Sequence, residues 1–496
     1  CGRMFIPPSF CYWCYPMVRG NIAVGVAPER RLKVAEDARL ERGPAYADHG
    51  KAPKIGPADW PMFRRDMRRT GGTMAKAGWP LKPAKGWPRK FGGRVHAPLI
   101  IGDTLYVTRI NEGCIVAFDK KGRELWTYAT GSRIDLPPTL HGALLLLGCH
   151  DGKVHAIRAS DGALAWRFTI APETRRMLAD DVVESPWPVI GSILVIDGTA
   201  YVCGGRITGL DGGLCLAAID AKTGEKKWIK QVGRVYEKKL KTGATNNPNG
   251  YWKKPYGPTE GQMTGSILVH AGGDELRLYE QDFCWRFSRK DGSFILVEGG
   301  TGYPHSHYTK ELPFHTFGRI DLAGIMAGRS ISGQFFVRGG MVLSFPEPAG
   351  TGLAFAHSQK WAMMLMGCRP EGVRWVRGYE DKKGGIPPAW GPITCDIRAS
   401  AVCAVGDLGF LVGQPLIRPE KWRPDMPPPK SYRDIKNYPS KPIPNAAHQL
   451  RCYSLKDGKE LGRIDLPGAP CGYGAMSFGQ GRLYLALQDG QLLAFE

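Results

Sequence analysis

The chain has 496 residues and is basic, with 67 Lys and Arg against 46 Asp and Glu, for a net charge of +21. The basic residues are scattered, and no nucleic-acid-binding module accompanies them, so nucleic acid is not an expected partner. A protein or an acidic polymer surface fits this charge better. No apolar run approaches the ~20 residues that span a bilayer.

The first 58 residues form a segment of their own, containing cysteines and ending in a linker. The chain opens at Cys1 without a visible signal peptide, so we expect it to begin mid-protein, the alternative being an acylated lipoprotein cysteine. Cys1, Cys11 and Cys14 lie in a Pro- and aromatic-rich stretch. A disulfide among them would hold that stretch together; a metal clip and free thiols are the alternatives. A short helix is predicted over 30–41.

At Asp59 the sequence changes to DWPMFRRDMRRTG, and residues 59–496 are predicted to form one domain built of repeats. In three units a glycine precedes a tryptophan by four residues: Gly122 and Trp126, Gly162 and Trp166, Gly224 and Trp228. Each pair follows an apolar strand and another short turn. Four short strands repeating at this period are typical of a β-propeller blade, in which the Trp packs against a neighbouring blade.

The stretch AIDAKTGEKKW resembles the tryptophan-docking motif of the PQQ-type, or quinoprotein-like, propeller repeat. The matching residues are Ala218, Asp220, Thr223, Gly224 and Trp228. The resemblance is strong over 59–235 and returns over 445–496. It implies an all-β, eight-bladed quinoprotein-like propeller of four-stranded antiparallel blades. It also implies a periplasmic or otherwise extracytoplasmic home in a bacterium.

The later units are less regular. A fourth unit is predicted over 266–297, degenerate units over about 317–345 and 351–377, a seventh from near Thr394, and an eighth at the C-terminus. A Pro-rich excursion over 418–444 interrupts the seventh. The long loop 236–262, with aromatic tips, is a candidate functional surface.

The last unit stops at Glu496 without an outer strand, which would leave a sheet edge open. The spacing from Trp87 to the following Gly and Arg matches the spacing from Trp126. We therefore predict that residues 86–91 supply the missing strand, pair with residues near 491–495 and close the ring. Trp87 should then take the docking role of Trp126, Trp166 and Trp228.

No catalytic residue can be named, and two classes of function stay open. In PQQ-dependent alcohol dehydrogenases, which share this repeat, the quinone lies between a Trp and a disulfide of adjacent cysteines. This sequence has no Cys-Cys pair, so no cofactor is expected. His305, His307 and His315 are weak metal candidates, since imidazole binds transition metals, but a polar loop also explains them.

A scaffold that binds another macromolecule through its propeller loops is the favoured function. The alternative is a quinone- or metal-dependent oxidoreductase with its site at the propeller channel. The oligomeric state is not predicted.

Overall fold

The computed structural model describes residues 3–6, 22–25, 33–67, 69–179, 182–206, 211–232, 267–269, 273–280, 283–299, 341–344, 352–358, 361–368, 390–423, 426, 434–439, 441–472 and 474–496. The described residues are almost entirely β-strand and connecting turns, with a single-turn 3-10 helix, η3 (Asp434–Asn437), as their one helical element. The prediction of an all-β chain is therefore confirmed.

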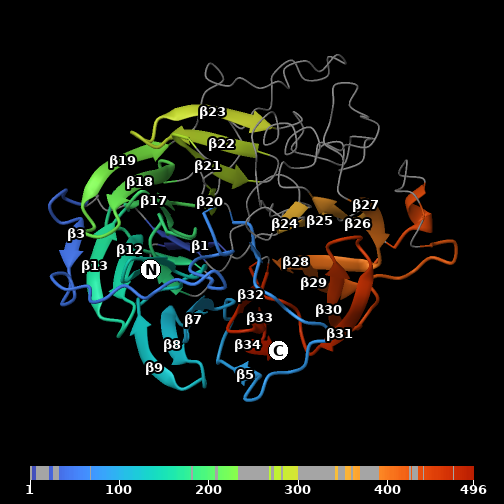
Figure 1. Cartoon of the computed structure of the whole chain (residues 1–496). Helices are drawn as coiled ribbons and strands as arrows, with labels where there is room; N and C mark the ends of the chain where they lie inside the picture. Colours follow the sequence, from blue (N-terminus) through green and yellow to red (C-terminus); the bar gives the residue numbers. More distant parts are fainter. Residues whose placement is uncertain are drawn as a thin grey trace, which may run out of the picture.

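Seven sheets of four or five strands follow one another along the described chain and fan around a common centre (Figure 1). The first contains β6 (Leu99–Ile101), β7 (Thr104–Arg109), β8 (Cys114–Asp119) and β9 (Glu124–Ala129). The second contains β10 (Thr139–His141), β11 (Leu144–Gly148), β12 (Lys153–Arg158) and β13 (Leu164–Thr169), with β3 (Leu40–Arg42) added outside β13. The third contains β16 (Leu194–Ile196), β17 (Thr199–Gly204), β18 (Leu214–Asp220) and β19 (Lys226–Val232).

The remaining four sheets repeat this antiparallel order. They are β20 (Ile267–Val269), β21 (Glu275–Glu280), β22 (Phe283–Ser288) and β23 (Phe294–Gly299); then β24 (Met341–Ser344), β25 (Gly352–Ser358), β26 (Trp361–Cys368) and β27 (Trp390–Cys395). The sixth has β28 (Ile397–Val405), β29 (Leu408–Pro415), β30 (His448–Ser454) and β31 (Glu460–Leu466), with β4 (Gly72–Thr73) parallel to β28. The seventh has β32 (Met476–Gly479), β33 (Arg482–Ala486), β34 (Gln491–Phe495) and β5 (Arg89–Lys90).

Two small hairpins lie outside these sheets. One pairs β1 (Arg3–Ile6) with β2 (Ile22–Gly25), and the other pairs β14 (Met177–Ala179) with β15 (Val182–Glu184). The second hairpin belongs to the connection between the second and third sheets.

The turn before β19 shows why the repeat needs its motif residues. Asp220 Oδ1 accepts the backbone N–H groups of Lys222 (3.0 Å) and Thr223 (2.8 Å), which fixes the turn. Gly224 has a φ of +74°, and a Cβ on it would lie 2.6 Å from Cδ2 of Trp166. The position therefore requires glycine for two reasons: the positive φ disfavours other residues, and a side chain would clash with the indole of Trp166.

Each docking tryptophan lies against the corresponding turn of the next sheet. Trp166 is fully buried, and Trp126 lies against Gly162, where a Cβ would lie 2.6 Å from Cε3 of the indole. Three indole N–H groups donate to carbonyl oxygens of the next turn: Trp166 to Lys222 (3.0 Å), Trp228 to Arg289 (3.0 Å) and Trp390 to Leu455 (2.6 Å). The sheets are thus joined by an aromatic plate and a hydrogen bond at each of these three junctions.

The last sheet is completed from the N-terminal side, as the sequence predicts. Lys90 pairs with Gln491 and Arg89 with Leu492. Trp87 contacts Tyr484 edge to face at 5.5 Å, which parallels Trp126 beside Tyr106 and Trp228 beside Tyr201. The contact with the neighbouring glycine differs, because the Arg89 guanidinium, rather than the indole, lies against Gly122.

The sixth sheet obtains its tryptophan from elsewhere in the chain. Gly462 stands four residues after Gly458, where other units carry Trp. Trp79 fills that space, since a Cβ on Gly462 would lie 2.8 Å from its Cζ2, and its indole N–H donates to the carbonyl of Leu461 at 3.2 Å.

Residues 60–73, from the DWPMFRRDMRRTG stretch, lie between the inner strands of several sheets. Trp60 bridges to Ile100, and the N–H of Leu140 donates to the carbonyl of Pro61 at 2.8 Å. Two buried guanidiniums reach other sheets: Arg64 donates to Val402 and Arg69 to Ile193, each at 3.4 Å. Burial lowers the pKa of both arginines to about 10. This segment therefore connects the inner strands of the first, second and sixth sheets.

Three sequence predictions need correction. Residues 33–41 are not helical; β3 pairs Leu40 with Phe168 on the edge of the second sheet, which covers an otherwise open strand. Residues 341–344 and 352–368, assigned to two degenerate units, lie in one sheet. Thr394 belongs to the outer strand of that sheet, and the following unit begins at Ile397. Residues 300–340 lie outside the described residues, so the count of eight blades stays a prediction.

We predict that replacing Trp166 by Ala lowers the free energy of unfolding by ~3–5 kcal/mol, because it removes a fully buried aromatic plate between two sheets. Trp87→Ala should cost less, since Trp87 is only half-buried. Urea denaturation followed by fluorescence and circular dichroism measures both. Equal losses for the two variants would contradict the burial argument.

Candidate binding face

One end of the sheets carries the long connections. Because strands alternate in direction, the connection between the second and third strands lies opposite the Gly-to-Trp turns. We call this end the insertion face and define it by the described connecting residues 110–113, 149–152, 205–206, 211–213, 416–423, 441–447 and 487–490. The links from one sheet to the next, such as 130–138 and 170–193, leave from the same end.

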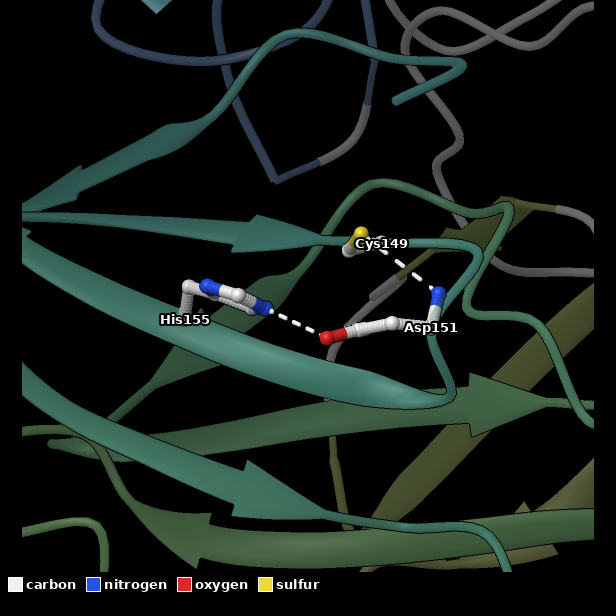
Figure 2. Close-up of side chains that lie close together, drawn as sticks. All are labelled: Cys149, Asp151 and His155. Atoms are coloured by element: carbon white, nitrogen blue, oxygen red, sulfur yellow. Dashed lines mark hydrogen bonds and ion pairs between the residues drawn. The ribbon is translucent and has the colours of Figure 1, made fainter. Parts of the chain in front are cut away.

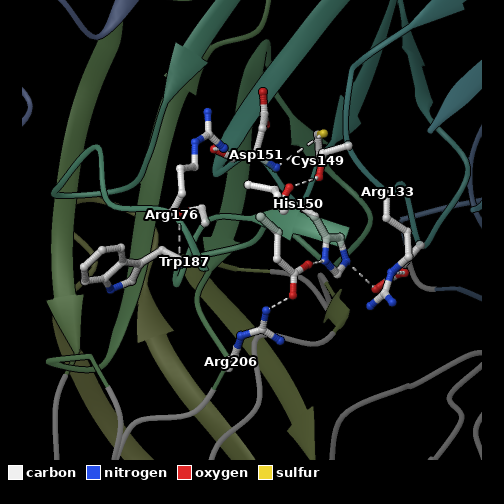
Figure 3. Close-up of polar contacts among 12 residues, drawn as sticks. Arg133, Cys149, His150, Asp151, Arg176, Trp187 and Arg206 are labelled. Atoms are coloured by element: carbon white, nitrogen blue, oxygen red, sulfur yellow. Dashed lines mark hydrogen bonds and ion pairs between the residues drawn. The ribbon is translucent and has the colours of Figure 1, made fainter. Parts of the chain in front are cut away.

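A buried ion network ties three sheets together at this face (Figure 3). His150, in the turn after β11, is fully buried and has a carboxylate at each ring nitrogen. Its Nε2 lies 2.8 Å from Asp135 Oδ2, and its Nδ1 contacts Glu184 at the end of β15. Arg133 pairs with Asp135 at 2.9 Å, and Arg206, which follows β17, pairs with Glu184.

The pKa values of His150 and Asp135 are both shifted toward the charged form. Burial alone would lower the pKa of His150, but the hydrogen bonds to Asp135 and Glu184 outweigh burial and raise it above its ordinary value. Burial would likewise raise the pKa of Asp135, yet the bond to His150 and the nearby arginines hold it below its usual range. An imidazolium between two carboxylates, each with its own guanidinium, is well compensated.

The hairpin β14–β15 is anchored by this network and exposes two apolar side chains. Glu184, the last residue of β15, is buried, and its carboxylate contacts His150 and Arg206. Leu178 and Val183 pair directly across the hairpin and are 42% and 60% exposed. Two aliphatic side chains are thus presented side by side on a fixed support.

A second charged cluster underlies a pocket of about 670 Å³ on the same face. Asp396, at the start of the sixth sheet, forms the floor and pairs with Arg418 and with the fully buried Arg451. The pocket is lined by Asp396, Pro415, Leu416, Ile417, Arg418, Ile443, Ala446, Ala447, Gln449, Arg463 and Asp465. Ile417 and Ile443, 44% and 38% exposed, provide its apolar surface.

The structure places the predicted residues unevenly. Trp87, Trp126, Trp166 and Trp228 lie at sheet junctions, far from any charged cluster of the insertion face. Cys1, Cys11, Cys14, His305, His307, His315 and the loop 236–262 lie outside the described residues, so the predicted disulfide, metal and loop surface stay predictions.

Sequence reasoning missed the ion network. The Cys-His-Asp-Gly turn reads as an ordinary hairpin turn, and nothing in the local pattern marks Glu184 or Arg206. The one available signal is His150 itself, because the corresponding residue of the last hairpin is Gln488.

Comparisons with known proteins agree with this architecture. The family model described as "Outer membrane protein assembly factor BamB" matches residues 84–245. The protein of that name from Burkholderia pseudomallei (strain K96243) is 31% identical over 139 residues, which are 28% of this chain and 30% of the relative. The match thus spans less than a third of either protein.

Solved structures with a similar arrangement include quinoproteins and BamB. Quinohemoprotein alcohol dehydrogenase ADHIIG from Pseudomonas putida HK5 is 12% identical, with 90% of this chain and 82% of that chain covered and a TM-score of 0.47. BamB from Moraxella catarrhalis is 12% identical, with 84% and 97% covered and a TM-score of 0.40.

The repeated sheets, the docking motifs and the family match together identify a PQQ-type β-propeller repeat protein. Among the described residues, no helix has the length and apolarity needed to cross a membrane.

We predict that Asp396→Asn lowers the free energy of unfolding by ~3–5 kcal/mol, because it removes the nearer and more buried of the two carboxylates, Asp396 and Glu460, that pair with the buried Arg451. Burial would raise the pKa of Asp396, but the hydrogen bond and charge of Arg451, with Arg418, hold it below its ordinary value. A depressed carboxyl pKa stabilises the fold above the unfolded value of about 3.9 and loses that effect as the pH falls through the folded value.

The difference between wild type and variant should therefore be constant from neutral pH to about pH 5 and shrink at lower pH. Urea titrations at several pH values measure it. Asp465→Asn, on the exposed rim of the same pocket, is the matched control and should change stability little. A difference that grows on acidification would show that Asp396 is not the ionised partner.

Proposed function

We propose that this chain is an extracytoplasmic, eight-bladed propeller that binds another protein through its insertion face and acts as a scaffold. The observation that carries the proposal is the exposed pair Leu178 and Val183 on a hairpin fixed by a buried ion network. Rigid presentation of apolar side chains reduces the ordering cost of binding.

The charge of the chain supports a partner with an acidic surface. The net charge of +21 favours association with negative surfaces and raises encounter rates. The relative from Burkholderia pseudomallei is named for the assembly of outer membrane proteins. That name supports a partner among proteins of outer-membrane assembly, and hence a periplasmic location.

A quinone does not fit the residues of this chain. The resemblance implies a cofactor between a Trp and a disulfide of adjacent cysteines, and the whole sequence contains no such pair. Residues 60–67 and 69–73 lie among the inner strands of several sheets, and Arg64 and Arg69 are buried there. We therefore propose a non-enzymatic role without PQQ.

Site-specific photocrosslinking tests the scaffold proposal. A photoreactive residue at Val183, introduced into the full chain in cells, should give a defined protein adduct identifiable by mass spectrometry. The same residue at Leu461, which is 41% exposed on an outer strand, is the control and should give none. No adduct at 183, or an equal adduct at 461, would refute binding through this hairpin. If the residue at position 183 crosslinks only to an acidic polymer, the partner is that polymer and the proposal of a protein partner is wrong.

Reconstitution tests the alternative. We expect the purified chain, incubated with PQQ and Ca²⁺, to show no dye-linked alcohol oxidation above a protein-free blank. A known PQQ-dependent alcohol dehydrogenase treated in parallel shows that the assay works. Robust turnover by this chain would establish an oxidoreductase and remove the argument from the missing cysteine pair.

A further inference from the structure

Three potential metal ligands of different chemistry meet beside the ion network, in the hairpin between β11 and β12 (Figure 2). They are Cys149, Asp151 and His155, and their ligand atoms all lie within 4.8 Å of one another. His155 Nε2 lies 3.0 Å from Asp151 Oδ2, and Cys149 Sγ accepts the backbone N–H of Asp151 at 3.5 Å. Cys149 and His155 are fully buried, while the Asp151 side chain keeps 10% of its surface exposed.

The hairpin does not need these residues to fold. The first and last sheets have the same turn, closed by the same backbone bond: Gly113 to Ile110, Gly152 to Cys149, and Gly490 to Leu487. At the positions of Cys149 and His155, the first sheet has Ile110 and Val116, and the last has Leu487 and Leu493, all buried. Apolar side chains at these two positions therefore allow the hairpin to form. Folding of the hairpin does not explain why the second sheet has a thiol and an imidazole there.

The aspartate also has an oxygen beyond what the turn uses. Asp151 Oδ1 accepts the backbone N–H of Lys153 at 3.0 Å, as Asp489 Oδ1 does for Gln491 at 3.1 Å. The second oxygen of Asp489 accepts from the amide of Gln491. The second oxygen of Asp151 instead faces His155, at the centre of the cluster.

Tyr128 supplies the outer contact that a metal-binding imidazole needs. Its hydroxyl lies 2.8 Å from His155 Nδ1. In this structure Nε2–H donates to Asp151, and Nδ1 accepts from the Tyr128 hydroxyl. A hydroxyl both donates and accepts, so the same contact would hold a proton on Nδ1 when a metal replaces the proton on Nε2. Two guanidiniums lie beside the cluster: Arg167, opposite His155, pairs with Glu41, and the exposed Arg176 donates to the backbone carbonyl of Asp151 at 3.1 Å.

We propose that Cys149, Asp151 and His155 form a binding site for a divalent transition metal ion of the zinc class. Zn–S bonds of about 2.3 Å and Zn–N or Zn–O bonds of about 2.0–2.2 Å place tetrahedral ligand atoms about 3.3–3.7 Å apart. The ligand atoms lie within 4.8 Å of one another, so the widest separation shortens by at most about 1–1.5 Å, while the 3.0 Å contact between His155 and Asp151 lengthens slightly. A thiolate and a carboxylate neutralise a dication, which suits a buried site. The soft sulfur selects zinc over magnesium or calcium.

Three protein ligands leave a fourth position for water or an exchangeable ligand, and the partly exposed Asp151 gives the ion a route in. The site is separate from the contacts of the ion network, because His150 uses both ring nitrogens for Asp135 and Glu184. It also stands apart from the proposed scaffold function.

Metal binding by the full-length chain tests the site. The chain is stripped with a chelator, titrated with Co²⁺, and monitored for the visible bands of tetrahedral cobalt and the sulfur-to-cobalt absorption in the near ultraviolet. We expect one equivalent of Co²⁺ to bind at this site and Zn²⁺ to displace it. Elemental analysis then gives the number of Zn²⁺ ions bound per chain. Mg²⁺ should not displace it.

Matched variants assign the signal. Asp151→Asn keeps the turn acceptor and should weaken binding at least tenfold, whereas Asp489→Asn, the same change in the last sheet, should have no effect. Cys149→Leu with His155→Leu copies the last hairpin and should abolish the signal while circular dichroism shows retained β-structure. If that variant does not fold, Cys149→Ser must remove the sulfur-to-cobalt band. Absence of the band from the wild type, or its persistence in Cys149→Ser, overturns the proposal.

Discussion

The contact between a docking tryptophan and the glycine turn of the next sheet is the interaction on which this structure depends. A four-stranded sheet has two apolar faces and cannot bury both alone. The indole covers the junction, and its N–H satisfies a carbonyl of the neighbouring turn, as with Trp166 and Lys222. Where the unit lacks its own tryptophan, as at Gly462, Trp79 from a distant part of the chain supplies one.

This packing leaves the two ends of the sheets free for different tasks. At the end with the Gly-to-Trp turns, the contacts between tryptophan and glycine limit which residues fit. In the part of the chain that the structure describes, the docking contacts lie at that end, and the connections of the insertion face hold a hairpin, buried ion pairs and a pocket. The network around His150 and the cluster around Asp396 then stiffen connections that would otherwise be loose. Both clusters lie at the base of exposed apolar side chains, an arrangement suited to recognition.

Residues before the first repeat are part of the architecture as well. Leu40–Arg42 covers the edge of the second sheet, residues 60–67 and 69–73 connect inner strands, and Arg89 and Lys90 complete the last sheet. Each addition satisfies backbone groups or apolar surface that the repeats alone leave open.

The sequence by itself determined the repeat, the docking motif and the pairing of residues 86–91 with the C-terminal strand, because these depend on local turn chemistry and on spacing. Only the tertiary structure decided that Arg89 meets Gly122, that Trp79 fills the space at Gly462, and that His150 joins Asp135 and Glu184. These contacts join residues from separate units, and their partners are set by how the sheets turn about the centre. No periodicity within one unit carries that information.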